Sequence, residues 1–221
     1  MTTYELNYTN ENAIIKVDLN FIKKIFNIDN LDQSKIDKLL FTKESIYSSS
    51  RLKGSKRLLD LIRKYHESKD IVITDGTANI GTDAINLASE FKKINAIEIS
   101  KINYNALVNN INVFNLGGKI IPHLGDTNKL ISSLKQDIIY IDAPWGGKHY
   151  KDSENINLYL GDVEISEFFE KNKSNAKTFI FKVPYNYNFN NFYKKVNENI
   201  FKHSFKKGVQ IKYYLLVIIN N

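Results

Sequence analysis

Apolar residues along the chain follow two spacings, one typical of strands and one typical of helices. Short runs rich in β-branched residues, bounded by turn residues, predict buried strands. These runs lie within residues 71–75, 95–100, 118–126, 137–147, 178–184 and 208–219, the third and fourth of them continuing into loops. Stretches with helical spacing of apolar residues fill most of the intervals, over residues 51–68, 81–93, 101–114, 164–171 and 190–198.

Strand and helix predictions alternate along most of the chain, which favours right-handed βαβ crossovers and a mostly parallel sheet covered by helices. We expect an α/β, Rossmann-like fold with seven strands. The runs at 178–184 and 208–219 are expected to form an antiparallel pair at the C-terminal edge of this sheet. No Gly/Ser-rich linker marks an internal boundary in the 221 residues, so residues 46–221 are predicted to form one domain.

Residues 1–45 are polar and rich in Asn, and they precede the regular alternation. Within them, Phe21, Ile22, Ile25 and Phe26 have the spacing of one helix face. We interpret this segment as an N-terminal extension that acts either as a substrate lid or as additional packing.

Charge and composition narrow the classes of partner and of site. The net charge of +7 and the pI near 9.2 favour an anionic partner, although charge alone does not identify it. The sequence has no Cys and only four His, which argues against disulfides and against a metal site. Neither a signal peptide nor an apolar run long enough to cross a membrane is present. We therefore expect a soluble intracellular monomer without metal, in the nucleus or cytoplasm, or in the host cytoplasm if the protein is viral.

The end of the first predicted strand is the place where an α/β sheet binds its ligand. Small and polar residues follow it and would let a ligand approach the backbone closely. They are Asp75, Gly76, Thr77, Asn79 and Gly81. A phosphate-binding P-loop is disfavoured because Gly81 is followed by Thr82 and Asp83 rather than by Lys. A dinucleotide fingerprint is incomplete, and an Asp at this strand end suits an ammonium group better than a pyrophosphate.

Acidic residues recur after the next two strands. Glu98 ends the second strand, at the position where a carboxylate can accept hydrogen bonds from both hydroxyls of a ribose. Asp126 follows the third strand and is expected to accept from an adenine amino group. Either residue alone would be an ordinary loop or helix-capping carboxylate, but their ordered recurrence predicts a site for a ligand that contains an adenosine.

The loop after the fourth strand carries the most specific pattern, Asp142-Ala143-Pro144-Trp145-Gly146-Gly147. It resembles a loop of methyltransferases that act on the exocyclic amino groups of aromatic bases, and such an amino group is a poor nucleophile. Polar oxygens that hold its hydrogens, and an aromatic ring that stacks on the base, orient it for attack. This resemblance implies that Asp142, Pro144 and Trp145 are catalytic, and that Asp142 also borders the cofactor.

This loop resembles the Asp/Asn/Ser-Pro-Pro-Tyr/Trp loop of class I methyltransferases that modify exocyclic amines. The longer form from Pro144 to Tyr150 is similar to the PWGGxxY motif of the trimethylguanosine synthase family, which methylates guanine N2 in a 7-methylguanosine RNA cap. Residues 41–62 and the segment TFIFKVPYNYN, residues 178–188, resemble further parts of that family. The resemblance covers the chain from about residue 40 to its end.

The resemblance implies S-adenosylmethionine as cofactor and capped RNA as partner. It implies that Trp145 stacks on the methylated guanine. Residues expected to bind the substrate in addition are Lys148, Lys182, Tyr185 and Asn186, with the two lysines near the cap phosphates.

The loop departs from the family pattern at Asp142 and Ala143, and Tyr185 stands where the family has Arg. Two alternatives therefore stay open. One is an adenine N6 methyltransferase acting on RNA or DNA, and the other is an inactive methyltransferase fold that serves as an RNA-binding subunit.

Overall fold

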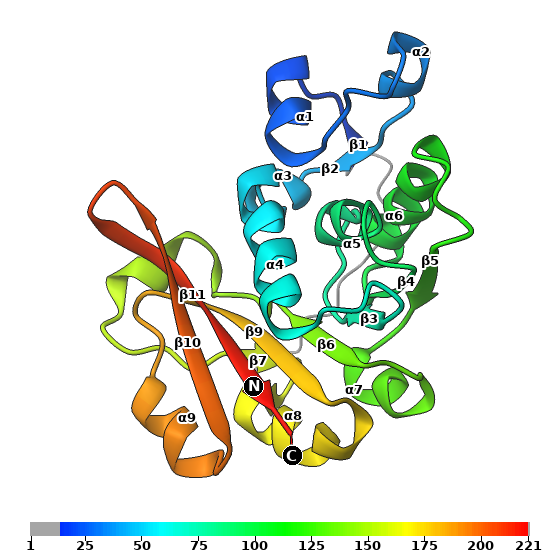
Figure 1. Ribbon diagram of the computed structural model, residues 1–221. Helices are drawn as coiled ribbons and strands as arrows, with labels where there is room; N and C mark the ends of the chain where they lie inside the picture. The colour runs from blue at the N-terminus through cyan, green and yellow to red at the C-terminus, as the bar shows by residue number, and fades with distance from the viewer. Residues whose placement is uncertain (1–13, 221) are drawn as a thin grey trace.

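A computed structural model describes residues 14–220 and places a seven-stranded sheet at their centre (Figure 1). The strand order is β10-β11-β9-β6-β3-β4-β5. Their bounds are Asn199–Lys207 for β10, Gln210–Ile219 for β11, Thr178–Pro184 for β9, Ile138–Ile141 for β6, Val72–Asp75 for β3, Lys93–Glu98 for β4 and Ile120–Leu124 for β5. The sheet is parallel from β9 to β5, and β11 is antiparallel to both of its neighbours. This confirms the predicted Rossmann-like α/β class.

Helices cover both faces of the sheet because successive side chains of a strand point to opposite faces. In β11, Leu215 and Val217 join the hydrophobic core on one side, and Leu216 and Ile218 join the core on the other side. The first core includes residues of α1 (Leu19–Ile25), α4 (Leu52–Tyr65), α5 (Thr82–Leu87) and α6 (Lys101–Val113). The second includes residues of α8 (Ile165–Asn172), of α9 (Phe189–Lys195) and of η2 (Ile131–Ser133), which follows α7 (Thr127–Leu130) in the chain.

The antiparallel edge differs from the prediction in one strand. The runs at 178–184 and 208–219 do pair antiparallel, as β9 and β11, but β10 lies outside them and forms the edge of the sheet. Residues 190–198 were predicted as helix; α9 ends at Lys195, and β10 then begins at Asn199. β10 carries three lysines among its nine residues, a composition that protects an exposed sheet edge from pairing with other chains and that hides the strand from a hydrophobic pattern.

The helix predicted over 81–93 was too long. α5 ends at Leu87, and residues from Lys93 onward belong to β4, which pairs in parallel with both β3 and β5. Residues 88–90 form a turn, and of the predicted helix only Lys93 enters the strand. In that strand, pairing on two sides outweighs helix propensity, which is the weaker term once tertiary contacts form.

The described part of the N-terminal segment packs against the domain. It contains β1 (Ile14–Ile15), α1, α2 (Gln33–Ile36) and β2 (Phe41–Thr42), and it leads into α3 (Ser45–Ser48). Ile22, Ile25 and Phe26 are buried in the first core, and the side chain of Asn110 on α6 bonds both the N–H and the carbonyl of Leu40. The first thirteen residues of the predicted extension lie outside the described part, and the lid role stays a prediction.

Candidate functional site

The strand order makes β6, β3 and β4 neighbours, so their carboxyl ends share one edge of the sheet. Asp75 ends β3, Glu98 ends β4, and Asp142 directly follows β6. Asp75 is 1% exposed. Burial raises the pKa of Asp75 well above its ordinary value, and the nearby carboxylates of Asp83, Asp142 and Glu98 raise this pKa further. Such a group of carboxylates attracts a positively charged ligand.

Thr77 joins the loop after β3 to the loop after β6. Its backbone N–H donates to Oδ1 of Asp75 at 3.1 Å, and its hydroxyl oxygen accepts from the backbone N–H of Asp142 at 2.9 Å. The sequence analysis placed both loops at one ligand, and this residue fixes their separation.

Glu98 is held by the backbone on both of its oxygens. Oε2 accepts from the N–H of Asn79 at 2.8 Å, and Oε1 accepts from the N–H of Ser100 at 2.7 Å. Burial raises the pKa of Glu98 to about 7, although these hydrogen bonds oppose the shift. Each carboxylate oxygen keeps a second lone pair, so the group can still accept from two ligand hydroxyls. Asn79 adopts a positive φ of 50° and also donates from Nδ2 to Ser48.

Asp126 caps a short helix. Its Oδ1 accepts from the N–H of Asn128 at 2.9 Å, at the start of α7. This is the ordinary capping role that the sequence analysis weighed, and it leaves Oδ2 for another donor. Its contact with an adenine stays a prediction.

Packing within the fold accounts for Gly76 and Gly81 in the loop after β3. A Cβ on Gly76 would lie 2.5 Å from the side chain of Ile141 and 2.9 Å from that of Thr127. Gly81 has a φ of 93°, which favours glycine, and a Cβ there would lie 2.7 Å from the Leu107 side chain. We predicted that these positions admit a ligand, but close packing of the loop against its neighbours explains both.

Asp142 forms a close ion pair with Lys182 on β9. Nζ of Lys182 lies 2.5 Å from Oδ2 of Asp142, and the two side chains are 12% and 17% exposed. Burial raises the pKa of Asp142, which the ammonium opposes. Burial lowers the pKa of Lys182, but the carboxylates of Asp142 and Asp83 outweigh it, so this pKa lies above its usual range. In the structure Lys182 lies against the loop after β6. Its expected contact with the cap phosphates stays a prediction.

A network of buried polar side chains is hydrogen-bonded to this ion pair. Lys182 also donates to the hydroxyl of Ser50 at 2.9 Å, and Ser50 donates to Oδ2 of Asp83 at 2.5 Å. Asp83 accepts in addition from Ser55 at 2.6 Å and from the phenol of Tyr140 at 3.2 Å. Three donors thus stabilise a carboxylate that is only 6% exposed. The network connects the start of α4 to the loop after β6.

Aromatic rings gather around Trp145. Its ring meets that of Tyr150 edge to face with centroids 5.3 Å apart, and Tyr150 lies 6.4 Å from Tyr185. Nζ of Lys182 lies 5.9 Å from the Trp145 centroid. Pro144 is exposed, whereas the indole N–H of Trp145 is buried without an acceptor among the described residues. The rings are steeply inclined to one another, so a base would stack on the face of a single ring.

Asn186 and Lys148 were both predicted to bind the substrate. Asn186 is 7% exposed and donates from Nδ2 to the carbonyls of Tyr150 and Ser153, so it supports the loop that carries Tyr150. Lys148 belongs to η3 (Gly147–Asp152), and its side chain lies outside the described part of the structure. Their contacts with a substrate stay predictions.

The sequence analysis missed Ser50, Asp83, Tyr140 and Tyr150 as parts of the site. Asp83 had a signal that could have been used, because it is a charged residue within the helix that follows the ligand-binding loop. Ser50 and Tyr140 had none, since a Ser before a helix and a Tyr in an apolar strand are both ordinary.

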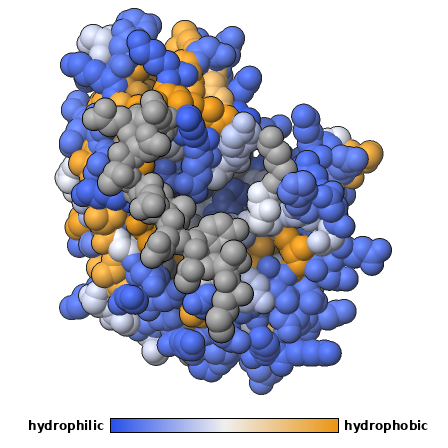
Figure 2. Space-filling model, turned by 180° about the vertical axis from the view of Figure 1, so that it is seen from behind, coloured by the Kyte–Doolittle hydropathy of each residue, from blue (hydrophilic) through white to orange (hydrophobic). Residues whose placement is uncertain are grey.

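Seen from behind, the surface is hollowed near its middle, and polar residues line the hollow (Figure 2). Among residues 14–220, no three acidic or His side chains are grouped as metal ligands would be. No helix of that same part is both long and apolar enough to cross a membrane.

Comparison with known proteins adds a family and a fold. The RNA cap guanine-N2 methyltransferase family matches residues 71–216. The chain is 37% identical over 131 residues to the uncharacterized protein L320 of Acanthamoeba polyphaga mimivirus, which covers 57% of this chain and 50% of that protein. This chain therefore spans about half the length of that curated relative.

Two solved structures share the fold. The tRNA m1G37 methyltransferase of M. jannaschii is 21% identical with a TM-score of 0.52, over 83% of this chain and 52% of that one. The O-methyltransferase of Bacillus cereus, solved in complex with SAH, is 13% identical with a TM-score of 0.59, over 91% and 96% of the two chains. At these identities the likeness supports the architecture alone.

Proposed function

Because this chain belongs to the RNA cap guanine-N2 methyltransferase family and is therefore a methyltransferase, we propose that it methylates the N2 amine of guanine in a 7-methylguanosine RNA cap. The methyl donor in this proposal is S-adenosylmethionine. The observation that carries it is the loop after β6, in which one short segment holds a carboxylate, Asp142, and an aromatic ring, Trp145, beside the acidic strand ends.

The residues at the strand ends suit the donor. S-adenosylmethionine supplies an activated methyl group on a cationic sulfur, and its methionyl part carries an ammonium. Asp75 is buried with other carboxylates around it, so a cation bound there would favour its ionised form. Glu98 retains lone pairs for the two ribose hydroxyls, and Asp126 retains one oxygen for the adenine amine.

The loop after β6 suits the acceptor. Lys182 occupies Oδ2 of Asp142, which leaves Oδ1 for an N–H of the guanine amine. Trp145 and Tyr150 supply the ring surface, and a 7-methylguanine carries a positive charge that the face of a tryptophan attracts. Holding the amine by its hydrogens and the base by its face fixes the direction of attack.

In the transfer, the N2 nitrogen forms a bond to the methyl carbon as the bond between that carbon and sulfur breaks. The product nitrogen then loses a proton, and in this proposal the carboxylate of Asp142 accepts it. The ion pair with Lys182 opposes the protonation of Asp142 that burial favours.

Radiolabelled S-adenosylmethionine tests the proposal with three acceptors, namely 7-methylguanosine diphosphate, GDP and an adenine-containing oligonucleotide. We expect label only on 7-methylguanosine diphosphate, on guanine N2 by digestion and chromatography, and loss of transfer in Asp142→Ala. Transfer to adenine would replace the proposal by N6 methylation. Tight binding of S-adenosylhomocysteine without transfer to any acceptor would favour an RNA-binding subunit.

A further inference from the structure

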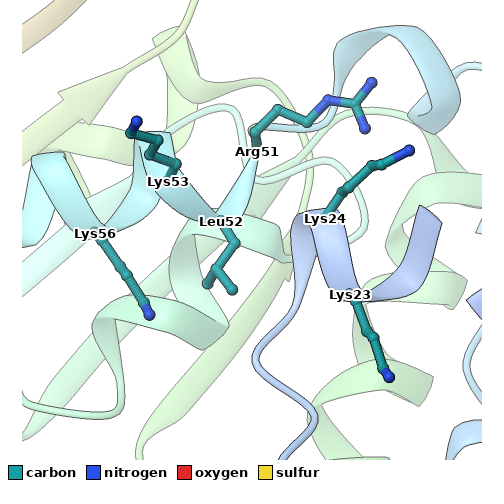
Figure 3. A pocket seen from close by; sticks show the side chains of 6 residues that line it. All are labelled: Lys23, Lys24, Arg51, Leu52, Lys53 and Lys56. Atoms are coloured by element: carbon teal, nitrogen blue, oxygen red, sulfur yellow. The ribbon is translucent and has the colours of Figure 1, made fainter. Parts of the chain in front are cut away.

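A groove rich in positive charge lies between α1 and the start of α4. It has a volume of about 450 Å³ and is lined by Lys23, Lys24, Arg51, Leu52, Lys53 and Lys56. Figure 3 shows Lys24 and Arg51 extending to one side and Lys23 and Lys56 to the other. We call this feature the basic groove. The five cationic side chains are exposed.

The charges of the basic groove are not balanced within the protein. Among residues 14–220, none of its five cations forms an ion pair with a carboxylate. Two of them, Lys53 and Lys56, lie in the first two turns of α4, where the helix dipole is also positive and where no acidic residue lies. Arg51 precedes the helix without a side-chain cap. Cations gathered at this end of a helix repel one another and the dipole, and a bound anion would reduce this repulsion.

The two walls of the basic groove are held together. The guanidinium of Arg51 lies 5.4 Å from the ring centroid of Phe21 on α1, a cation–π contact between the two helices. Ile22 and Ile25 of α1 are buried in the first core, and Phe21 packs against the same core. The cations of α1 and α4 are therefore presented together by a fixed framework.

The basic groove begins next to the proposed acceptor site. Ser50 donates to Asp83 and accepts from Lys182, which is paired with Asp142. Arg51 is the next residue of the chain. An RNA chain that leaves the acceptor loop near Ser50 would reach Arg51 first and then the lysines of α4. Lys53 and Lys56 are three residues apart, about 5 to 6 Å at Cβ, and their side chains extend to opposite sides of α4 (Figure 3).

We infer that the basic groove binds the phosphates of the RNA chain that follows the cap. This inference rests on the proposed function for its substrate, but it concerns a surface separate from the methyl-transfer site. It gives the described N-terminal segment a role in holding RNA, through Lys23 and Lys24 of α1. The groove reads no sequence, because ammonium and guanidinium groups on phosphates contact no base edge.

The test compares two variants with the same change in charge. The first is Lys24→Gln, Lys53→Gln and Lys56→Gln in one chain, with Arg51 kept because it packs on Phe21. The control is Lys93→Gln, Lys135→Gln and Lys177→Gln, three exposed lysines at or before the first residues of β4, β6 and β9, at the opposite edge of the sheet. Gln resembles Lys in helix propensity, so the helices should persist.

The probe is a fluorescein-labelled, uncapped single-stranded RNA, and anisotropy gives its affinity over a salt series. We expect the groove variant to lose about tenfold or more in affinity, and the magnitude of its slope of log K against log salt to fall by about 2. The control should lose much less. Methylation kinetics then extend the test: KM for a capped oligonucleotide should rise in the groove variant, while KM for a cap dinucleotide stays unchanged.

Equal losses in the groove variant and the control would overturn the inference, since only overall charge would matter. Unchanged RNA binding together with lost binding to anionic lipid vesicles would overturn it in favour of a membrane surface. Because the anisotropy probe has no cap and needs no methyl transfer, loss of the proposed activity leaves this measurement intact.

Discussion

Trp145 is the single tryptophan of the chain and the largest ring in the loop after β6. Trp145→Ala removes the surface on which a charged guanine would stack, and a desolvated cation–π contact is worth about 2 kcal/mol. We expect kcat/KM for 7-methylguanosine diphosphate to fall about tenfold to a hundredfold, and Trp145→Phe to recover part of it. Label transfer measures this, with circular dichroism as the control for folding. Full activity in Trp145→Ala would place the base elsewhere.

Substitution of Lys182 tests whether this side chain positions Asp142 or binds the cap phosphates. If it serves Asp142, as the ion pair indicates, Lys182→Met leaves burial unopposed and raises the pKa of Asp142 further. The acidic limb of the pH–kcat/KM profile should then move to higher pH, and Lys182→Arg should restore it. If Lys182 binds cap phosphates, KM should rise for substrates with phosphates and the profile should stay in place. A KM effect alone would thus reject the positioning role.

At the scale of elements, α1 tests whether the N-terminal segment belongs to the core. Ile25 is fully buried in α1, whereas Leu19 of the same helix is 41% exposed. Ile25→Ala should lower the free energy of unfolding by about 2 to 5 kcal/mol, and Leu19→Ala by less than about 1 kcal/mol. Urea denaturation measures both. Equal and small losses would mean that α1 opens independently of the domain, as the lid hypothesis requires.

The elements that could be predicted from the sequence are those buried on both faces. β3, β6 and β9 follow from their apolar runs, and Asp75, Glu98 and Asp142 follow from standing at strand ends. β10 could not be predicted, because an edge strand needs few apolar residues. The partner of Lys182 could not be predicted either, since β6 and β9 become neighbours only through the sheet order.

The whole molecule should be less stable at alkaline than at mildly acidic pH, through its buried carboxyl groups. Burial raises the pKa of Glu98 from 4.5 to about 7 on folding. The stability that this group contributes is fully present below about 4.5 and is lost as the pH rises through about 7. Its loss between about pH 5 and about pH 8.5 is on the order of 2 to 3 kcal/mol.

Urea denaturation of the protein and of Glu98→Gln at several pH values measures this contribution. The variant should show a flatter dependence on pH, whatever its absolute stability. Parallel pH profiles for the two proteins would show that Glu98 ionises normally in the folded state. Bound S-adenosylmethionine should reduce the alkaline loss, because ligand groups then compensate the ionised carboxylates.

Thr77 contacts Asp75 through its backbone N–H and Asp142 through its hydroxyl. A methyl donor that binds Asp75 would therefore hold the start of the acceptor loop in place, through Thr77, before the second reactant binds. The consequence is a compulsory sequence of arrival and departure: donor first and demethylated donor last. Product-inhibition kinetics should show S-adenosylhomocysteine competing with the methyl donor alone, and Thr77→Val, which removes the shared hydroxyl, should allow either reactant to enter first.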